Sequence, residues 1–286
     1  MGNGKRLLFF DVLRIVSIAM IVFYHIAQVL KWSLFCYEPP VFHIFYLNPG
    51  VIGVAILIFV SGAMLEYSHP KLETVDEVSE FWVKRLFRIY PTFWMSMVIG
   101  LVCVPYLIST LYPFTIFLEF AGFNTWSGHW GGVINGMGWF VGLIVTLYFC
   151  YPFLSASIRK YPYLKLFLNA FVEIFSRYVL TAVRTPWPLG SYPDRFLPFC
   201  NFLEFGLGIF IVQQNFFPKW TYDNRWIWCA AELSFYVFLI NYLTNMKILM
   251  IDSLPLYFIA VALLAWLMML GDQKIQTFLK KVGGLS

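Results

Sequence analysis

The sequence has few charged side chains, since Asp, Glu, Lys and Arg make up only 12% of its 286 residues. Soluble domains carry about 25% charged residues, so this scarcity excludes an ordinary soluble protein. Hydrophobic residues account for 60% and aromatic residues for 21%, and the mean hydropathy is +0.72. Long apolar runs of this kind predict an all-α polytopic membrane protein.

Cysteine is also scarce: the chain has five, an odd number. Because most of them lie in or beside apolar runs, we expect no disulfide framework. The basic residues behind the net charge of +5 are dispersed among loops, which excludes a nucleic-acid surface as their explanation. We expect no metal site. We expect no cleavable signal peptide either, because the first apolar run is too long for one.

Eight apolar segments are predicted to span the bilayer: 7–30, 50–67, 89–111, 138–155, 164–183, 196–216, 226–246 and 254–271. A shorter run, Pro113–Phe123, cannot span and is expected to re-enter the membrane or lie at its interface. With a cytoplasmic N-terminus, fourteen basic residues lie on the inner side and four on the outer side. This positive-inside bias predicts a multi-pass protein of the cell membrane with both termini and the loop Ser68–Glu80 in the cytoplasm.

The first apolar segment carries Asp11, Arg14 and His25, and ionisable residues inside a membrane mark functional sites because burying a charge there costs at least ~2.5 kcal/mol. Arg14 and His25 are eleven residues apart, which places them on one helix face about ~16 Å apart along the axis. Asp11 is three residues before Arg14, at a spacing that allows an ion pair. The alternatives are that Asp11 and Arg14 only anchor the helix at the interface and that His25 is a packing residue.

The second segment contains small residues, among them Gly50 and Gly53, that permit close approach, so we expect it to pack against the first segment. Ser61 in this segment is a weak nucleophile candidate, since intramembrane serines usually bond to their own helix. After the following polar loop, Arg85 and Arg88 share a helix face at the cytoplasmic side. A guanidinium pair suits phosphate, although positive-inside anchoring would explain the same residues.

Further along the chain, the segment Tyr112–Gly138 is an outer region rich in Trp, Gly and Asn, a weak indication of carbohydrate contact. Glu204 and Asn241 are buried polar candidates without an assigned role. Glu173 and Arg177 are four residues apart and are expected to pair with each other.

Four motifs, in this order, resemble the acyltransferase-3 family of integral membrane enzymes. DVLRIVSIAMIVFYH is similar to the family's opening helix, in which ten residues separate an Arg and a His, here Arg14 and His25. GVIGVAILIFVSGAML resembles its glycine-led second helix, and RLFRIYPTFW its arginine pair followed by Tyr90 and Pro91. GWFVGLIVTLYFCYP keeps the family's spacing of Trp139, Tyr148 and Pro152.

The sequence departs from the family in three respects. Many members have Glu where this chain has Ile144 or Val145, and many have His where it has Asn241. Members commonly have about ten spans, whereas eight and one shorter run are predicted here. We expect a single transmembrane domain over residues 1–286, built as a bundle of about eight to ten helices.

The resemblance implies acetyl-CoA, or another acyl-CoA, as a donor from the cytosol and a hydroxyl acceptor on a carbohydrate or lipid-linked glycan outside. On this hypothesis Arg85 and Arg88, with Tyr90 beside them, hold the coenzyme. Arg14, with Asp11, orients the donor or the developing oxyanion, and His25 is the general base. Ser61, Trp139, Tyr148, Glu204 and Asn241 are acceptor or channel candidates. Alternatives are a transporter with an Arg and His relay or a non-catalytic relative, and the sequence leaves a homodimer open.

Overall fold

A computed structural model describes residues 8–34, 49–105, 112–123, 134–136, 138–182 and 197–214. These residues form helices, and no strand occurs among them. The chain divides into two compact units, the first formed by Met1–Met64 with Gln214–Ser286 and the second by Leu65–Gln213. We describe each unit by itself. The predicted spans 226–246 and 254–271 and the C-terminal tail lie outside the described residues.

The described part of the first unit consists of α1 (Leu8–Leu34) and most of α2 (Pro49–Ser68). The two helices pack closely through glycine: a Cβ at Gly53 would lie 2.7 Å from the Ser17 carbonyl oxygen. A Cβ at Gly50 would lie 2.6 Å from the ring of Tyr24. Only a residue without a side chain allows this approach, and the predicted packing of the second segment on the first is confirmed.

In the second unit α3 (Val75–Cys103) begins fourteen residues before the predicted start at 89. Thr74 is the N-cap, and its hydroxyl oxygen accepts from the Glu77 backbone N–H while the Glu77 carboxylate accepts from the Thr74 N–H. This reciprocal capping box satisfies two backbone donors that a helix start would otherwise leave without a partner. The expected loop Ser68–Glu80 is therefore wrong in extent: the segment between α2 and α3 runs only from His69 to Thr74.

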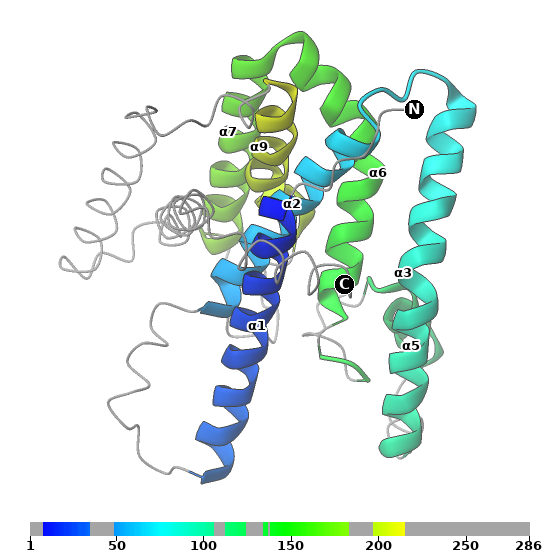
Figure 1. Ribbon diagram of the computed structural model, residues 1–286. Helices are drawn as coiled ribbons and strands as arrows, with labels where there is room; N and C mark the ends of the chain where they lie inside the picture. Colours follow the sequence, from blue (N-terminus) through cyan, green and yellow to red (C-terminus); the bar gives the residue numbers. More distant parts are fainter. Residues whose placement is uncertain are drawn as a thin grey trace, which may run out of the picture. The chain divides into compact units, whose positions relative to one another are not determined.

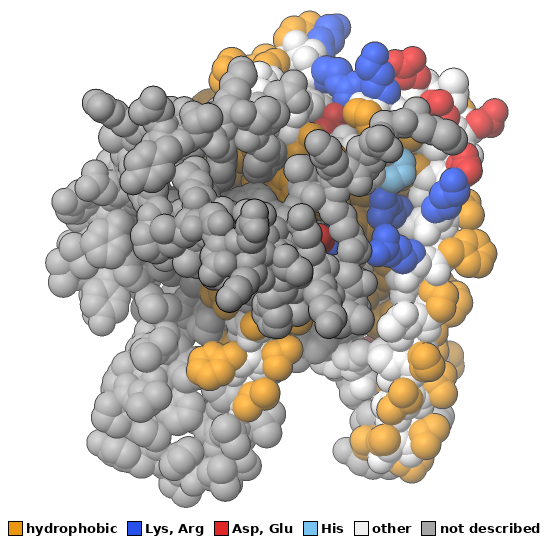
Figure 2. Space-filling model, in the orientation of Figure 1, with side chains coloured by type: hydrophobic (Ala, Val, Ile, Leu, Met, Phe, Trp, Pro, Cys, Tyr) orange, Lys and Arg blue, Asp and Glu red, His pale blue; other side chains and the backbone are white. Residues whose placement is uncertain are grey.

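The exposed charged side chains of the described part of the second unit gather at one end, where α3 begins and α6 ends (Figure 2). We call this part, residues 69–88 and 159–165, the charged end. Beyond it α3 has no charged residue and exposes large apolar side chains, with exposed fractions from 47% at Trp94 to 74% at Val102. A helix face this apolar and this exposed fits a lipid environment rather than water.

The short helix α5 (Pro113–Ala121) confirms the prediction that the run after Pro113 is too short to span. Gly122 ends it in the left-handed conformation at φ 78°. Two side chains of α3 bond to its last carbonyls: Tyr90 donates its hydroxyl to the Ala121 oxygen and Trp94 its indole N–H to the Phe120 oxygen, both at 2.9 Å. The end of α5 is thus satisfied by α3 rather than by water.

The rest of the second unit is a helical group of α6 (Trp139–Lys160), α7 (Pro162–Ala182), the 3₁₀ helix η3 (Pro198–Asn201) and α9 (Phe202–Gln213). Helices α6, α7 and α9 pack on one another, and α3 packs on α6 (Figure 1). Glu173 of α7 is buried and accepts from the Leu203 N–H at the start of α9, at 3.0 Å. The side chain of Arg177, the predicted partner of Glu173, lies outside the described residues.

Two of the described helices, α3 and α6, are long and apolar enough to cross a membrane by length and composition. The predicted segments 7–30, 50–67, 138–155, 164–183 and 196–216 correspond to helices in the structure, with ends shifted by a few residues. The structure therefore shows the predicted all-helical class, with two candidate spans among the described residues.

Candidate functional site

The acidic and basic residues predicted to pair on the first helix do so. Asp11 and Arg14 form an i, i+3 ion pair at 3.8 Å between a carboxylate oxygen and a guanidinium nitrogen. The Asp11 residue is only 8% exposed, whereas the Arg14 side chain is 30% exposed. Asp11 therefore offsets part of the guanidinium charge, while the Arg14 side chain stays partly exposed.

His25 lies on the same continuous helix as Arg14, eleven residues later and half-buried. Its ring meets the neighbouring Tyr24 ring edge to face, with centroids 5.4 Å apart. Along a helix, eleven residues correspond to a separation of about ~16 Å. Ser17, between them, donates its hydroxyl to the Leu13 carbonyl oxygen at 2.6 Å and thus bonds to its own helix. Ser61 of α2 is half-buried.

Arg85 and Arg88 lie at the charged end but in different environments. The Arg85 guanidinium is half-buried, over the rings of Phe81 at 5.5 Å and Tyr148 at 5.9 Å. Arg88 is exposed. The predicted pair is therefore one arginine packed between aromatic rings and one open to a ligand.

Three further sequence candidates have structural contacts. Tyr148 supports α3, because its carbonyl oxygen accepts the indole N–H of Trp82 at 3.3 Å. Pro152, four residues later, has no N–H to donate to that oxygen, so the indole replaces the missing helix bond. Tyr90 bonds to the end of α5, as described above, and the Trp139 ring meets Phe140.

His69 lies between α2 and α3, with its Nδ1 atom 3.5 Å from an Arg85 guanidinium nitrogen. Burial, followed by the positive charges of Arg85 and Lys84, lowers the pKa of His69 below its ordinary value. A neutral ring can accept the guanidinium N–H, so the geometry and the direction of the pKa agree.

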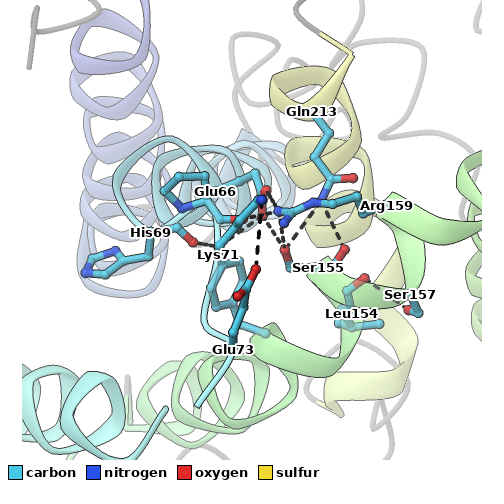
Figure 3. Close-up of polar contacts among 11 residues, drawn as sticks. Glu66, His69, Lys71, Glu73, Leu154, Ser155, Ser157, Arg159 and Gln213 are labelled. Atoms are coloured by element: carbon cyan, nitrogen blue, oxygen red, sulfur yellow. Dashed lines mark hydrogen bonds and ion pairs between the residues drawn. The ribbon is translucent and has the colours of Figure 1, made fainter. Parts of the chain in front are cut away.

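Among the described residues of the second unit, the polar group with the most hydrogen bonds surrounds Glu66, near the end of α2 (Figure 3). This carboxylate is 2% exposed. One of its oxygens lies 2.5 Å from an Arg159 guanidinium nitrogen, and the other accepts from the Ser155 hydroxyl at 2.6 Å. We call Glu66, Tyr151, Ser155, Arg159 and Gln213 the Glu66 cluster.

The cluster joins three helices and the segment between α2 and α3. The Tyr151 hydroxyl lies 3.0 Å from the Glu66 carboxylate and 2.7 Å from the His69 carbonyl oxygen, and its single proton can be donated to one of them at a time. Arg159 also donates to the Pro70 carbonyl oxygen. Gln213 of α9 donates to the Ser155 carbonyl oxygen at 3.0 Å. The cluster was not predicted from the sequence, although Glu66 lies in an apolar segment as Glu204 does.

A cavity of about 280 Å³ lies beside the Glu66 cluster, between the segment 69–73 and the last turns of α6. Its basic lining residues are Lys71, Arg159 and Lys160. His69 and Glu73 line it as well. The cavity is therefore at the charged end and within reach of cations from two elements.

The remaining candidates are not gathered into one site by the described residues. Glu204 is buried on α9, 6% exposed. Asn241 lies outside the described residues. Arg14 and His25 belong to the first unit and Arg85 and Arg88 to the second, so a common site for them stays a prediction. Among the described residues, no group of three or more His, Cys, Asp or Glu could hold a metal ion.

Comparison with known proteins gives one finding. A family model described as an acyltransferase domain matches residues 7–286, essentially the whole chain. No curated protein and no solved structure matches the sequence. The expected resemblance is confirmed, and the chain belongs to the acyltransferase-3 family.

Proposed function

We propose that this protein is a multi-pass membrane enzyme that transfers an acyl group, acetyl in the simplest case, from cytosolic acyl-CoA to a hydroxyl of a glycan outside the cytoplasm. Membership of the acyltransferase-3 family supports acyl transfer in general and does not favour the transporter alternative. Donor, acceptor and sidedness are the parts that we add.

The proposal rests on the ionisable residues that α1 carries. One continuous helix holds Arg14, oriented by Asp11, and a half-buried His25. A membrane-associated protein that keeps an acid, a guanidinium and an imidazole on one apolar helix has a use for them. Imidazole, with an ordinary pKa of ~6.5, suits proton transfer near neutral pH.

In the proposed reaction the acceptor hydroxyl oxygen attacks the thioester carbonyl carbon while His25 takes the hydroxyl proton. The C–S bond then breaks, and the coenzyme leaves as a thiolate that takes up the proton held by His25, which returns the imidazole to its neutral form. The separation of about ~16 Å between Arg14 and His25 is too long for Arg14 to bond the oxyanion formed beside His25. Of the two roles expected for Arg14, we therefore retain orientation of the donor.

The donor's phosphates would bind at the charged end, which fits a cytoplasmic location by the positive-inside rule. Arg88 is exposed and has a guanidinium that matches phosphate oxygens. Arg85, held over two rings, supplies positive charge next to it. Tyr90, two residues after Arg88, bonds α5, and its proposed part is to hold this segment of α3 in place.

The proposal is tested with purified protein in lipid nanodiscs, by measuring thiol release from acetyl-CoA with a glycan acceptor. We expect His25→Gln to slow transfer by roughly 10²–10⁴-fold, the usual contribution of a general base, while donor affinity stays the same. Ser17→Ala is the matched control, since Ser17 is polar, on the same helix, and bonded to its own backbone. It should transfer at the parent rate.

A folded His25→Gln protein that binds donor and transfers at the parent rate would remove His25 from the mechanism. Absence of acetyl-CoA binding and of thiol release in the parent protein would remove the proposed donor altogether.

A further inference from the structure

Arg159 offers hydrogen-bond donors that the described fold does not use. Its contacts with Glu66, Pro70 and Ser155 all involve one guanidinium nitrogen, Nη2. The Nη1 and Nε atoms make no hydrogen bond with the described residues, and the side chain is 38% exposed and lines the cavity. A guanidinium fixed by a buried carboxylate, with two nitrogens left over, is already oriented to bind an anion.

The charges around the cavity also favour an anion. Lys71, Arg159 and Lys160 bring three positive charges, and Glu66 and Glu73 two negative ones, so the balance is +1. Glu73 pairs with Lys71 at 3.9 Å, but both side chains are mostly exposed. Because exposed ion pairs are weak, an anion that binds Lys71 loses little free energy by displacing Glu73 from it. The lowered pKa of His69 keeps that ring from adding a further charge at neutral pH.

The cavity's size restricts what it can hold. About 280 Å³ is just below the range of ~300–1,000 Å³ for small-molecule sites, so a whole coenzyme does not fit. The diphosphate of coenzyme A lies in the middle of the molecule and needs an open groove. Its 3′-phosphate is a terminal group with three free oxygens and can enter a small cavity end-on.

We propose that the cavity between the segment 69–73 and the end of α6 binds the 3′-phosphate of the acyl-CoA donor, through Arg159 with Lys71 and Lys160. This inference rests on the proposed function and divides the donor's phosphates between two places. The diphosphate binds at Arg88, and the 3′-phosphate binds in the cavity. His69 contacts Arg85 and lines the cavity, so the two places adjoin.

The test compares acetyl-CoA with acetyl-3′-dephospho-CoA by calorimetry, on the full chain in nanodiscs of neutral lipid. The parent protein should bind the dephospho donor about tenfold more weakly or worse, as expected for losing charge-assisted bonds. The double variant Lys71→Gln/Lys160→Gln, which leaves the Glu66 and Arg159 pair intact, should reduce this discrimination. Arg159→Lys keeps a cation near Glu66 but removes the guanidinium donors, and it should reduce discrimination further.

Two controls separate the cavity from its surroundings. Lys84→Gln removes a cation of the charged end that pairs with Glu80 and does not line the cavity, and it should leave both affinities unchanged. Arg88→Gln should weaken both donors by the same factor, because both carry the diphosphate.

Equal binding of the two donors by the parent would overturn the inference and leave the proposed function standing, whereas binding of neither would overturn both. A second arm uses nanodiscs with anionic lipid. If the cavity variants changed only the binding of that lipid and never the discrimination between donors, the cavity would be a headgroup site and the assignment to the donor would be overturned.

Discussion

Removing Arg159 should destabilise the protein because it leaves the Glu66 carboxylate buried without its cation. Glu66 is 2% exposed, and breaking a fully buried pair costs about 3–5 kcal/mol. Water reaches Arg159, whose side chain is 38% exposed. In the absence of Arg159, Ser155 still donates to the carboxylate, and the Tyr151 hydroxyl can donate to it instead of to the His69 carbonyl oxygen. We therefore expect Arg159→Gln to cost less than the full amount, about 2–3 kcal/mol.

A second substitution distinguishes an unpaired buried charge from a loss of packing as the cause of the destabilisation. Adding Glu66→Gln to Arg159→Gln removes the buried charge, so the double variant should be more stable than the single Arg159→Gln variant. Glu66→Gln retains an oxygen that can accept from Ser155. A contact that contributed only packing would give the opposite order, with the double variant the least stable.

The assay is thermal unfolding in detergent, followed by circular dichroism, with Lys84→Gln as the matched control. Lys84 and Glu80 also form an ion pair at 2.5 Å, but both side chains are about two-thirds exposed, and such pairs contribute roughly 0–1 kcal/mol. For a chain of 286 residues, a cost of 2 kcal/mol corresponds to a fall of about 3 °C in Tm. If Arg159→Gln had the same Tm as the Lys84→Gln control, the argument from the burial of Glu66 would fail.

Three other outcomes can be measured. Gly53→Ala should lower Tm, because the added Cβ would lie 2.7 Å from a backbone oxygen and overpacking costs about 1–3 kcal/mol. Gly136→Ala is the control, since its Cβ would meet no atom within 4 Å, and equal Tm values for the two variants would contradict the close packing. The free energy of unfolding should be greatest above the ordinary histidine pKa of ~6.5 and fall as the pH drops below it, because His69 is protonated in the unfolded chain at a higher pH than in the folded protein. His69→Gln should flatten this pH dependence, and an unchanged profile would exclude His69 as its source. Asp76→Cys, in a background without native cysteines, should resist impermeant thiol reagents applied outside the cell, and labelling from outside would reverse the proposed sidedness.

Local sequence patterns predicted the features that depend on neighbours along the chain. The Asp11 and Arg14 pair follows from i, i+3 spacing, and the shortness of α5 follows from counting apolar residues. The start of α3 was misplaced because the polar segment before 89 was read as a loop. Its capping box, Thr74 followed three residues later by Glu77, is a local signal that would have predicted the helix start.

The Glu66 cluster depends on contacts that no spacing rule gives. Arg159 is 93 residues from Glu66, and Ser155 is 89 residues away. Glu66 lies in an apolar segment, so it could have been predicted from the sequence as a buried carboxylate in the same way as Glu204. Its partner could not. Arg159 was counted only as one of the basic residues on the inner side. Selecting Arg159 among fourteen such residues as the partner of Glu66 requires knowing that the last turn of α2, within the second unit, lies against α6.

The scarcity of charge makes each charged side chain of the described part informative. A buried carboxylate needs hydrogen-bonding or charged partners. Asp11 and Glu66 each have an arginine partner, whereas Glu173 accepts a backbone N–H. Pairing with a carboxylate uses only part of a guanidinium, since it has five donors. Arg14 and Arg159 are both held from one side and partly exposed on the other. In such an arrangement the same residue stabilises the fold and points hydrogen-bond donors outward. The proposed binding of a phosphorylated donor requires cations of this kind in an apolar protein with few charges.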